Sequence, residues 1–181
     1  MLTFKIKDFI WMIIKTLVIV FIFDFLSSSF FPTFQQTYLF PSFHILIVIY
    51  FAFFQPAARL PFLILLVELF HSIFTVEGWA LGTLTGCIVA NILVLVKDTI
   101  QFSSFVATFF LVYAVQVLWS VISGIFLSIK LENWMILKSY FQFSLIQGII
   151  LGLVALPLLK LLEKIWDKED SSSSFASDQV F

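Results

Sequence analysis

Glu68 and His71 are the two residues of this chain best placed to do chemistry, because both can ionise and both lie within an apolar stretch. Their spacing puts them on one face of a helix, one turn apart. An ionisable group in mid-membrane is costly and is a functional candidate by default. We expect a buried polar pair, with Glu68 protonated or hydrogen-bonded to His71 and to a neighbouring helix. The alternative is contact with a partner or a conformational switch.

A Glu-x-x-His pair is also half of the di-iron site of four-helix carboxylate proteins. A second such motif is missing, and the only other histidine, His44, has no matching acid. The single cysteine, Cys87, has no adjacent base and is expected to be a small apolar filler. No motif combines a nucleophile, a base and an orienting group. We therefore predict no catalytic residue, no metal and no cofactor.

Other polar side chains interrupt the apolar stretches. We expect Asp24, close to the outer end of the first stretch, to reach water. Asn91, Gln116 and Gln147 are expected to tie helices together, at about 0.6–2 kcal/mol each. Gln142 belongs to the same set of intramembrane polar residues. A transporter would use the same residue types to line a cavity, and this alternative stays open.

Small residues recur every four positions in the last three apolar stretches, so each set lies on one helix face. In lipid, such faces let two backbones approach closely, and this packing replaces the hydrophobic drive. We expect them to pack the bundle internally; the alternative is that one faces outward and receives a partner's single helix. The sets are Gly78, Gly82, Gly86 and Ala90; Ser120, Gly124 and Ser128; and Ser144, Gly148 and Gly152.

The composition is that of a membrane protein. Apolar residues make up 61% of the 181-residue chain and charged residues 12%, and phenylalanine alone occurs 25 times. A soluble domain carries about twice that charged share. The net charge of −1 gives no reason to expect nucleic acid or a polybasic lipid-binding patch.

The elements that position these residues are six apolar stretches, at residues 9–26, 39–54, 60–76, 78–97, 105–129 and 140–162. A helix needs about 20 residues to cross the hydrocarbon, so the second and third are short. Apolar runs without alternation favour helices over a barrel. We predict an all-α, polytopic bundle of six transmembrane helices with short loops. It forms one domain over 1–166, followed by a disordered cytoplasmic tail over 167–181.

Lysine and arginine in short loops set the orientation. Placing both termini in the cytoplasm leaves only Lys130 and Lys138 outside. Lys15, inside the first helix, can reach toward the cytoplasmic face. The residues then placed inside are Lys5, Lys7, Arg59, Lys97, Lys160, Lys164 and Lys168.

Over roughly residues 9–166, this pattern resembles the rod-shape-determining membrane protein family MreD. The most specific part is PSFHILIVIYFAFFQPAARL, in which Pro41 opens the second span and Tyr50 lies late in it. Pro56 and Arg59 close that span. The ending LVALPLLKLLEKI is similar to the family's last span.

The third span departs from the family pattern. The family has a glycine and then an aspartate near the end of this span. Here residues 60–70 contain no glycine, the acid is Glu68, and His71 falls nearer the aspartate position. The resemblance therefore assigns no specific role to either residue.

The resemblance implies a non-enzymatic scaffold in the lipid of the bacterial inner membrane that maintains cell shape. Such a protein binds MreC, a periplasmic coiled-coil protein, together with the polymerase and transpeptidase of cell-wall elongation. The family fold is similar to the substrate-binding subunits of energy-coupling-factor vitamin transporters, which supplies the alternative function. Such a subunit needs convergent polar groups in an outward-facing pocket. It also needs a small-residue face on its first helix, which has no glycine here.

Overall fold

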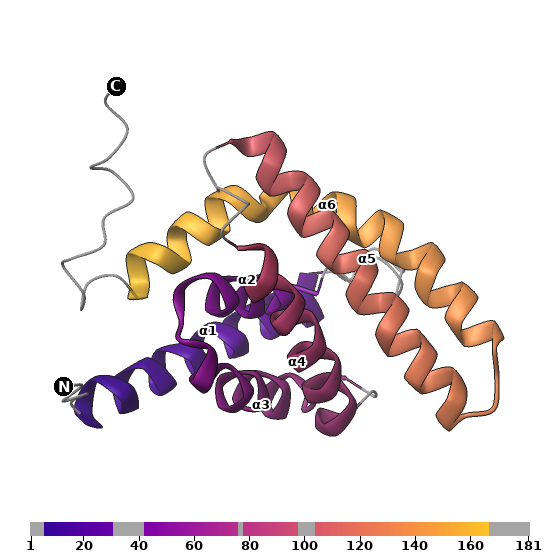
Figure 1. Cartoon of the computed structure of the whole chain (residues 1–181), viewed down its shortest axis with the longest axis horizontal. Helices are drawn as coiled ribbons and strands as arrows, with labels where there is room; N and C mark the ends of the chain where they lie inside the picture. Colours follow the sequence, from indigo (N-terminus) through magenta and orange to yellow (C-terminus); the bar gives the residue numbers. More distant parts are fainter. Residues whose placement is uncertain (1–5, 31–41, 76–77, 98–103, 167–181) are drawn as a thin grey trace.

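The computed structural model describes residues 6–30, 42–75, 78–97 and 104–166, and over these it is helical with no β-strand. The predicted tail, 167–181, and Pro41 lie outside the described residues. The described part contains six α-helices, which agrees with the predicted number (Figure 1). They are α1 (Ile6–Phe30), α2 (His44–Phe54), α3 (Leu60–His71), α4 (Trp79–Val96), α5 (Phe105–Lys130) and α6 (Met135–Trp166), and a 3₁₀ turn, η2 (Ala57–Arg59), precedes α3.

Four of the helices, α1, α4, α5 and α6, are long and apolar enough to cross a membrane. The other two are shorter than the stretches 39–54 and 60–76 suggest, because α2 has 11 residues and α3 has 12. At 1.5 Å per residue they extend only ~16–18 Å. Helix α2 ends just before Gln55 and Pro56. Helix α3 ends in two overlapping turns, in which the N–H groups of Ile73 and Phe74 donate to the carbonyl oxygens of Phe70 and His71.

The short helix α2 is the interior of the bundle. Its first nine residues, His44 to Ala52, are all buried. It contacts every other α-helix of the described structure. A helix that is apolar on all sides is surrounded either by protein or by lipid, and here the surroundings are protein. Enclosure also explains why α2 can be short, because protein rather than lipid surrounds these nine residues.

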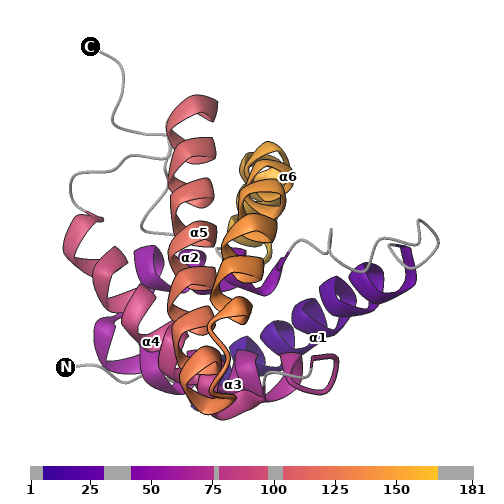
Figure 2. The same cartoon turned by 90° about the vertical axis from the view of Figure 1, so that its right-hand side faces the viewer.

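Helices α5 and α6 form a long antiparallel pair that lies beside the other four (Figures 1 and 2). Proline at position 157 lies inside α6 and removes one helical hydrogen bond, and α6 bends in its second half (Figure 1). This bend carries the end of α6 back over the bundle. There Lys15 Nζ of α1 donates to the carbonyl oxygen of Ile165, at 3.0 Å.

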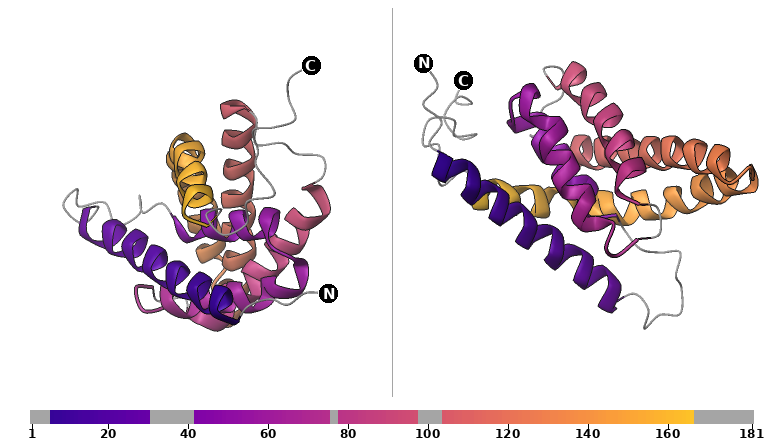
Figure 3. Two further views of the ribbon diagram at one scale, coloured as in Figure 1. Left: turned by 90° about the vertical axis from the view of Figure 1, so that its left-hand side faces the viewer. Right: turned by 90° about the horizontal axis from the view of Figure 1, so that it is seen from below.

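Helix α1 lies along one edge of the bundle (Figure 3). Its inner side packs on α3 and α2 through residues such as Ile19, Val20 and Phe23. Its outer side is apolar and exposed. The bundle therefore has a peripheral helix at one edge and an enclosed one at its centre.

Candidate functional site

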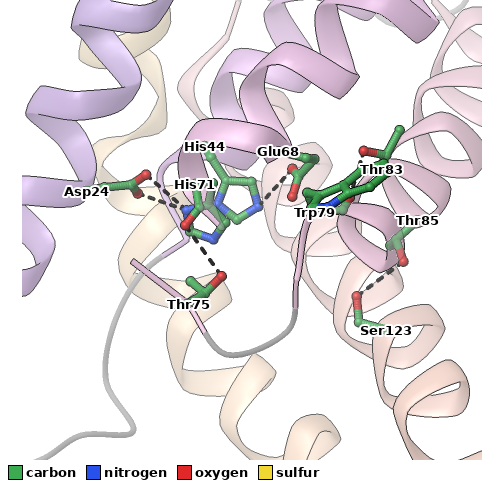
Figure 4. Close-up of polar contacts among 9 residues, drawn as sticks. All are labelled: Asp24, His44, Glu68, His71, Thr75, Trp79, Thr83, Thr85 and Ser123. Carbon is green, nitrogen blue, oxygen red and sulfur yellow. Dashed lines mark hydrogen bonds and ion pairs between the residues drawn. The ribbon is translucent and has the colours of Figure 1, made fainter. Parts of the chain in front are cut away.

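Four titratable side chains from three helices meet at one end of α2: Asp24, His44, Glu68 and His71. We refer to them as the carboxylate–imidazole cluster (Figure 4). Asp24 lies near the end of α1, His44 is the first residue of α2, and the other two occupy the last turns of α3. The antiparallel order of these helices brings the three helix ends together.

Asp24 and His71 form the closest contact of the cluster. His71 Nδ1 lies 3.0 Å from both carboxylate oxygens of Asp24, so α1 and α3 are joined directly. Asp24 is only 5% exposed. The expectation that Asp24 reaches water is therefore wrong, because its side chain points into the bundle rather than along the helix to the surface.

His44 connects this pair to Glu68. Its ring stacks on that of His71, with centroids 3.7 Å apart, and the edge of Trp119 approaches it at 5.2 Å. Its Nε2 lies 3.6 Å from Oε1 of Glu68, and both side chains are buried. Glu68 is therefore the acid beside His44, a neighbour that sequence reasoning did not identify because it comes from another helix, α3.

Glu68 and His71 share a helix face as predicted, and each faces a residue of another helix. Space for the Glu68 carboxylate is provided by α4. A Cβ placed on Gly82 would collide with this carboxylate, with the Glu68 Cδ at 2.9 Å. Gly82 therefore lets α3 and α4 approach while an acid lies between them. The helix itself begins after Gly78, whose φ of +83° suits glycine.

Two carboxyl groups and two imidazoles at these distances can hold and exchange protons. No group of three or more His, Cys, Asp or Glu within the described segments is arranged to hold a metal ion.

The signal that the sequence carries for this cluster is general: each of its four residues is ionisable and lies in an apolar stretch. That signal marks a residue without indicating its partner.

The small-residue faces lie inside the bundle. A Cβ on Gly86 would lie 2.6 Å from Ile64 and 3.0 Å from Trp119, so this face packs on α3 and α5. Gly148 and Gly152 meet Tyr113 and Phe109 of α5. The remaining members Ala90, Ser120, Gly124, Ser128 and Ser144 are also buried, whereas Gly78 is exposed and precedes α4.

The intramembrane amides divide into two kinds. Gln116 Nε2 donates to Gln147 Oε1 at 3.1 Å, which links α5 to α6. Asn91 instead donates to the Cys87 carbonyl of its own helix and is exposed, so the expected role in joining helices is wrong. Gln142 is exposed as well. A link that sequence reasoning missed joins Ser123 of α5 to Thr85 of α4 at 3.3 Å.

The other end of α2 is aromatic. Tyr50 stacks on Trp166 of α6 with centroids 4.8 Å apart, and Phe51 lies 5.3 Å from the same ring. Pro56 and Arg59 bracket the 3₁₀ turn that leads into α3.

No protein-family model matches the sequence, and neither a curated protein nor a solved structure matches it.

Proposed function

We propose that the protein is a non-enzymatic membrane scaffold whose α1 helix binds the single transmembrane helix of a partner. The resemblance to the MreD family suggests the partner's class, an MreC-like periplasmic coiled-coil protein. It further suggests a complex with the polymerase and transpeptidase of cell-wall elongation in the bacterial inner membrane. In this proposal both termini lie in the cytoplasm.

The observation that carries the proposal is the outer face of α1. Large apolar side chains are about half exposed along the helix, at alternating intervals of three and four residues: Trp11, Ile14, Val18, Phe21 and Phe25. This spacing forms the seam through which one helix packs against another. Lipid can cover the same seam, and a partner's helix can replace that lipid without rearranging the bundle.

The small-residue faces are not the docking surface in this proposal. Those of α4, α5 and α6 are closed by neighbouring helices, and a larger side chain there would meet Ile64, Tyr113 or Phe109. A bulky substitution at Gly82 or Gly148 would therefore damage the bundle before it affected a partner. The exposed apolar surface of α1 can accept a larger side chain without such a collision.

The test is a matched pair of substitutions on exposed helix faces. Val18 on α1 and Leu153 on α6 are 51% and 54% exposed, so tryptophan at either position points outward. We expect Val18→Trp to reduce co-purification of a single-span coiled-coil protein about tenfold, which corresponds to about 1.4 kcal/mol of binding free energy. Leu153→Trp should leave the yield of the partner unchanged.

The experiment is done with tagged protein purified from its own host in mild detergent, with mass spectrometry of the associated proteins. Both variants must elute as the wild type does. If neither substitution changes the partner's yield, α1 is not the docking helix. If no single-span protein accompanies the wild type, the scaffold proposal itself is wrong.

A vitamin-binding transporter subunit is the second candidate, because the carboxylate–imidazole cluster gathers polar groups from three helices. Against it, α1 presents large rather than small side chains at the face available to a coupling protein. Recovery of paired cytoplasmic ATPases and a transmembrane coupling subunit in the same purification would favour this candidate. Vitamin binding by the purified chain would establish it.

A further inference from the structure

His44 is a buried polar residue that partner binding through α1 does not use. It is 3% exposed, and neither of its ring nitrogens has a hydrogen-bond partner among the described residues. A neutral imidazole has one N–H donor and one acceptor nitrogen. Buried groups of this kind are nearly always hydrogen-bonded, so an exception points to strain, to function or to a bound species.

The two acid–imidazole contacts of the cluster differ in length. His71 Nδ1 is 3.0 Å from each oxygen of Asp24, which is a hydrogen-bonding distance. A hydrogen bond requires a proton between the two atoms, so this contact contains one. His44 Nε2 is 3.6 Å from Glu68 Oε1, which is too long for a hydrogen bond. The second contact is therefore an ion-pair distance rather than a hydrogen bond.

We propose that the His44–Glu68 contact is a proton-binding site. Starting from a neutral imidazole and an ionised carboxylate, the pair accepts one proton from hydronium and releases one water molecule. The proton then lies between Nε2 and Oε1, and the net charge of the cluster rises by one. A charge-assisted hydrogen bond in a buried site is strong, which draws the two atoms together.

The packing around the pair favours a proton over a larger ligand. The rings of His44 and His71 are stacked at 3.7 Å, which leaves no room for an organic molecule between them. The carboxylate of Glu68 fills the space where Gly82 lacks a Cβ. The edge of Trp119 covers a further side of the His44 ring.

The titratable groups around the pair come from named elements of the described structure. Asp24 of α1 acts through its contact with His71 of α3. Cys87 of α4 is close enough to interact electrostatically with Glu68. Helix α5 contributes the non-titrating Trp119. Helix α6 packs on the opposite end of α2, at Tyr50.

Uptake of the proton has a structural consequence. The His44–Glu68 hydrogen bond would join the start of α2 to the end of α3, where Asp24 already joins α3 to α1. Protonation therefore couples three helix ends that face the same side of the bundle. The site would respond to the pH of that side whether or not a partner is bound.

The chain suits a direct test, because it contains only two histidines and both belong to the cluster. The full-length protein with a histidine-free tag, labelled with ¹⁵N-histidine and placed in lipid nanodiscs, is titrated by NMR from mildly alkaline pH down to the lowest pH at which it stays folded. We expect the two ring nitrogens of His44 to move toward the imidazolium position. Substitution of His71 by asparagine assigns the remaining signals to His44.

Glu68→Gln is the decisive variant, because glutamine keeps the size of the side chain and removes the ionisable group. We expect the pH-dependent change of the His44 signals to be lost. Glu132→Gln, at an exposed position after α5, is the matched control and should leave the titration unchanged. A His44 signal that does not change with pH, or that changes identically in Glu68→Gln, overturns the proposal.

If Glu68→Gln fails to fold, infrared spectroscopy of the wild type gives an independent answer. The pH difference spectrum should contain a buried carboxyl or imidazolium band that is absent after His44→Gln. A wild-type difference spectrum identical to that of His44→Gln overturns the proposal. Both measurements use the purified chain alone, so their outcome is distinct from that of the α1 docking experiment.

Discussion

The two ends of α2 are stabilised by different means. Its His44 end lies among carboxylates and a second imidazole, with contacts of 3.0 to 3.7 Å between α1, α2 and α3. Its Tyr50 end lies among aromatic rings, with Trp166 of α6 stacked at 4.8 Å. One short helix thus joins a polar contact at one end to an apolar contact at the other.

The difference shows how a membrane protein selects one arrangement of helices. Lipid tails are as apolar as a protein core, so burying aromatic rings gives little hydrophobic drive and contributes mainly close packing. A buried charge without its partner is far more costly than a poorly packed ring. We infer that the polar end determines which helices become neighbours, and that the aromatic end stabilises the result.

The largest effect should follow from removing one acid of the polar end. Asp24→Leu leaves His71 without its carboxylate, and we expect a loss of about 3–5 kcal/mol, as for other broken buried pairs. Equilibrium unfolding in a denaturing detergent gives the free energy. Asp24→Leu with His71→Leu should recover much of the loss, because the imidazole that lost its carboxylate is then removed as well. A double variant as unstable as the single one would contradict this account.

A cavity at the aromatic end should have the next largest effect. Phe51 is completely buried, and Phe51→Ala leaves a void between α2 and Trp166. We expect the free energy of unfolding to fall by about 2–4 kcal/mol. This is somewhat less than for a phenylalanine in a soluble core, because in lipid only the packing contribution is lost. The same unfolding assay measures it. Phe110→Ala, on an exposed face of α5, is the control and should change little.

An uncharged polar contact should have a smaller effect than either end of α2. Gln116→Leu removes the hydrogen bond to Gln147 without leaving a buried charge. We expect about 0.6 kcal/mol, the mean measured for hydrogen bonds between membrane helices, and no more than about 1.7 kcal/mol, the largest value measured. A loss as large as that of Asp24→Leu would show that polarity, rather than charge, distinguishes the His44 end.

The smallest effect is expected from the polar contact at the aromatic end. Lys15 donates to the carbonyl of Ile165, in the last turn of α6. Lys15→Met keeps the aliphatic stem and removes the charge, and we expect a loss of about 0.3–1 kcal/mol from this helix-end interaction. The free energies of unfolding of Lys15→Met and Phe51→Ala are measured side by side. If Lys15→Met proved the more damaging, the aromatic end would depend on charge after all.

The helical class and the number of helices could be predicted from the sequence, because long apolar runs report directly on the membrane. The first and last residues of α2 and α3 were harder to predict. Hydropathy continues past His71, whereas the helix ends there in tight turns. Enclosure by other helices is what allows an 11-residue helix at the centre of the bundle, and the apolar run of α2 does not reveal enclosure.

The cluster was only partly predictable. Glu68 and His71 could be placed on one helix face, because that depends on helix periodicity alone. The partners Asp24 and His44 depend on which helices are neighbours and on their relative depth, and no local pattern contains either. Asn91 and Gln116 illustrate the same limit, since both are amides in apolar helices and only Gln116 faces another helix.

The enclosure of α2 has a consequence for the order in which the chain is made. Membrane helices usually insert one by one and associate afterwards. A helix of ~16 Å cannot cross ~30 Å of hydrocarbon alone. Its Tyr50 end is covered by Trp166, at the end of α6, which follows α2 by four helices in chain order. The enclosed helix α2 therefore reaches its final packing only after α6 has been synthesised.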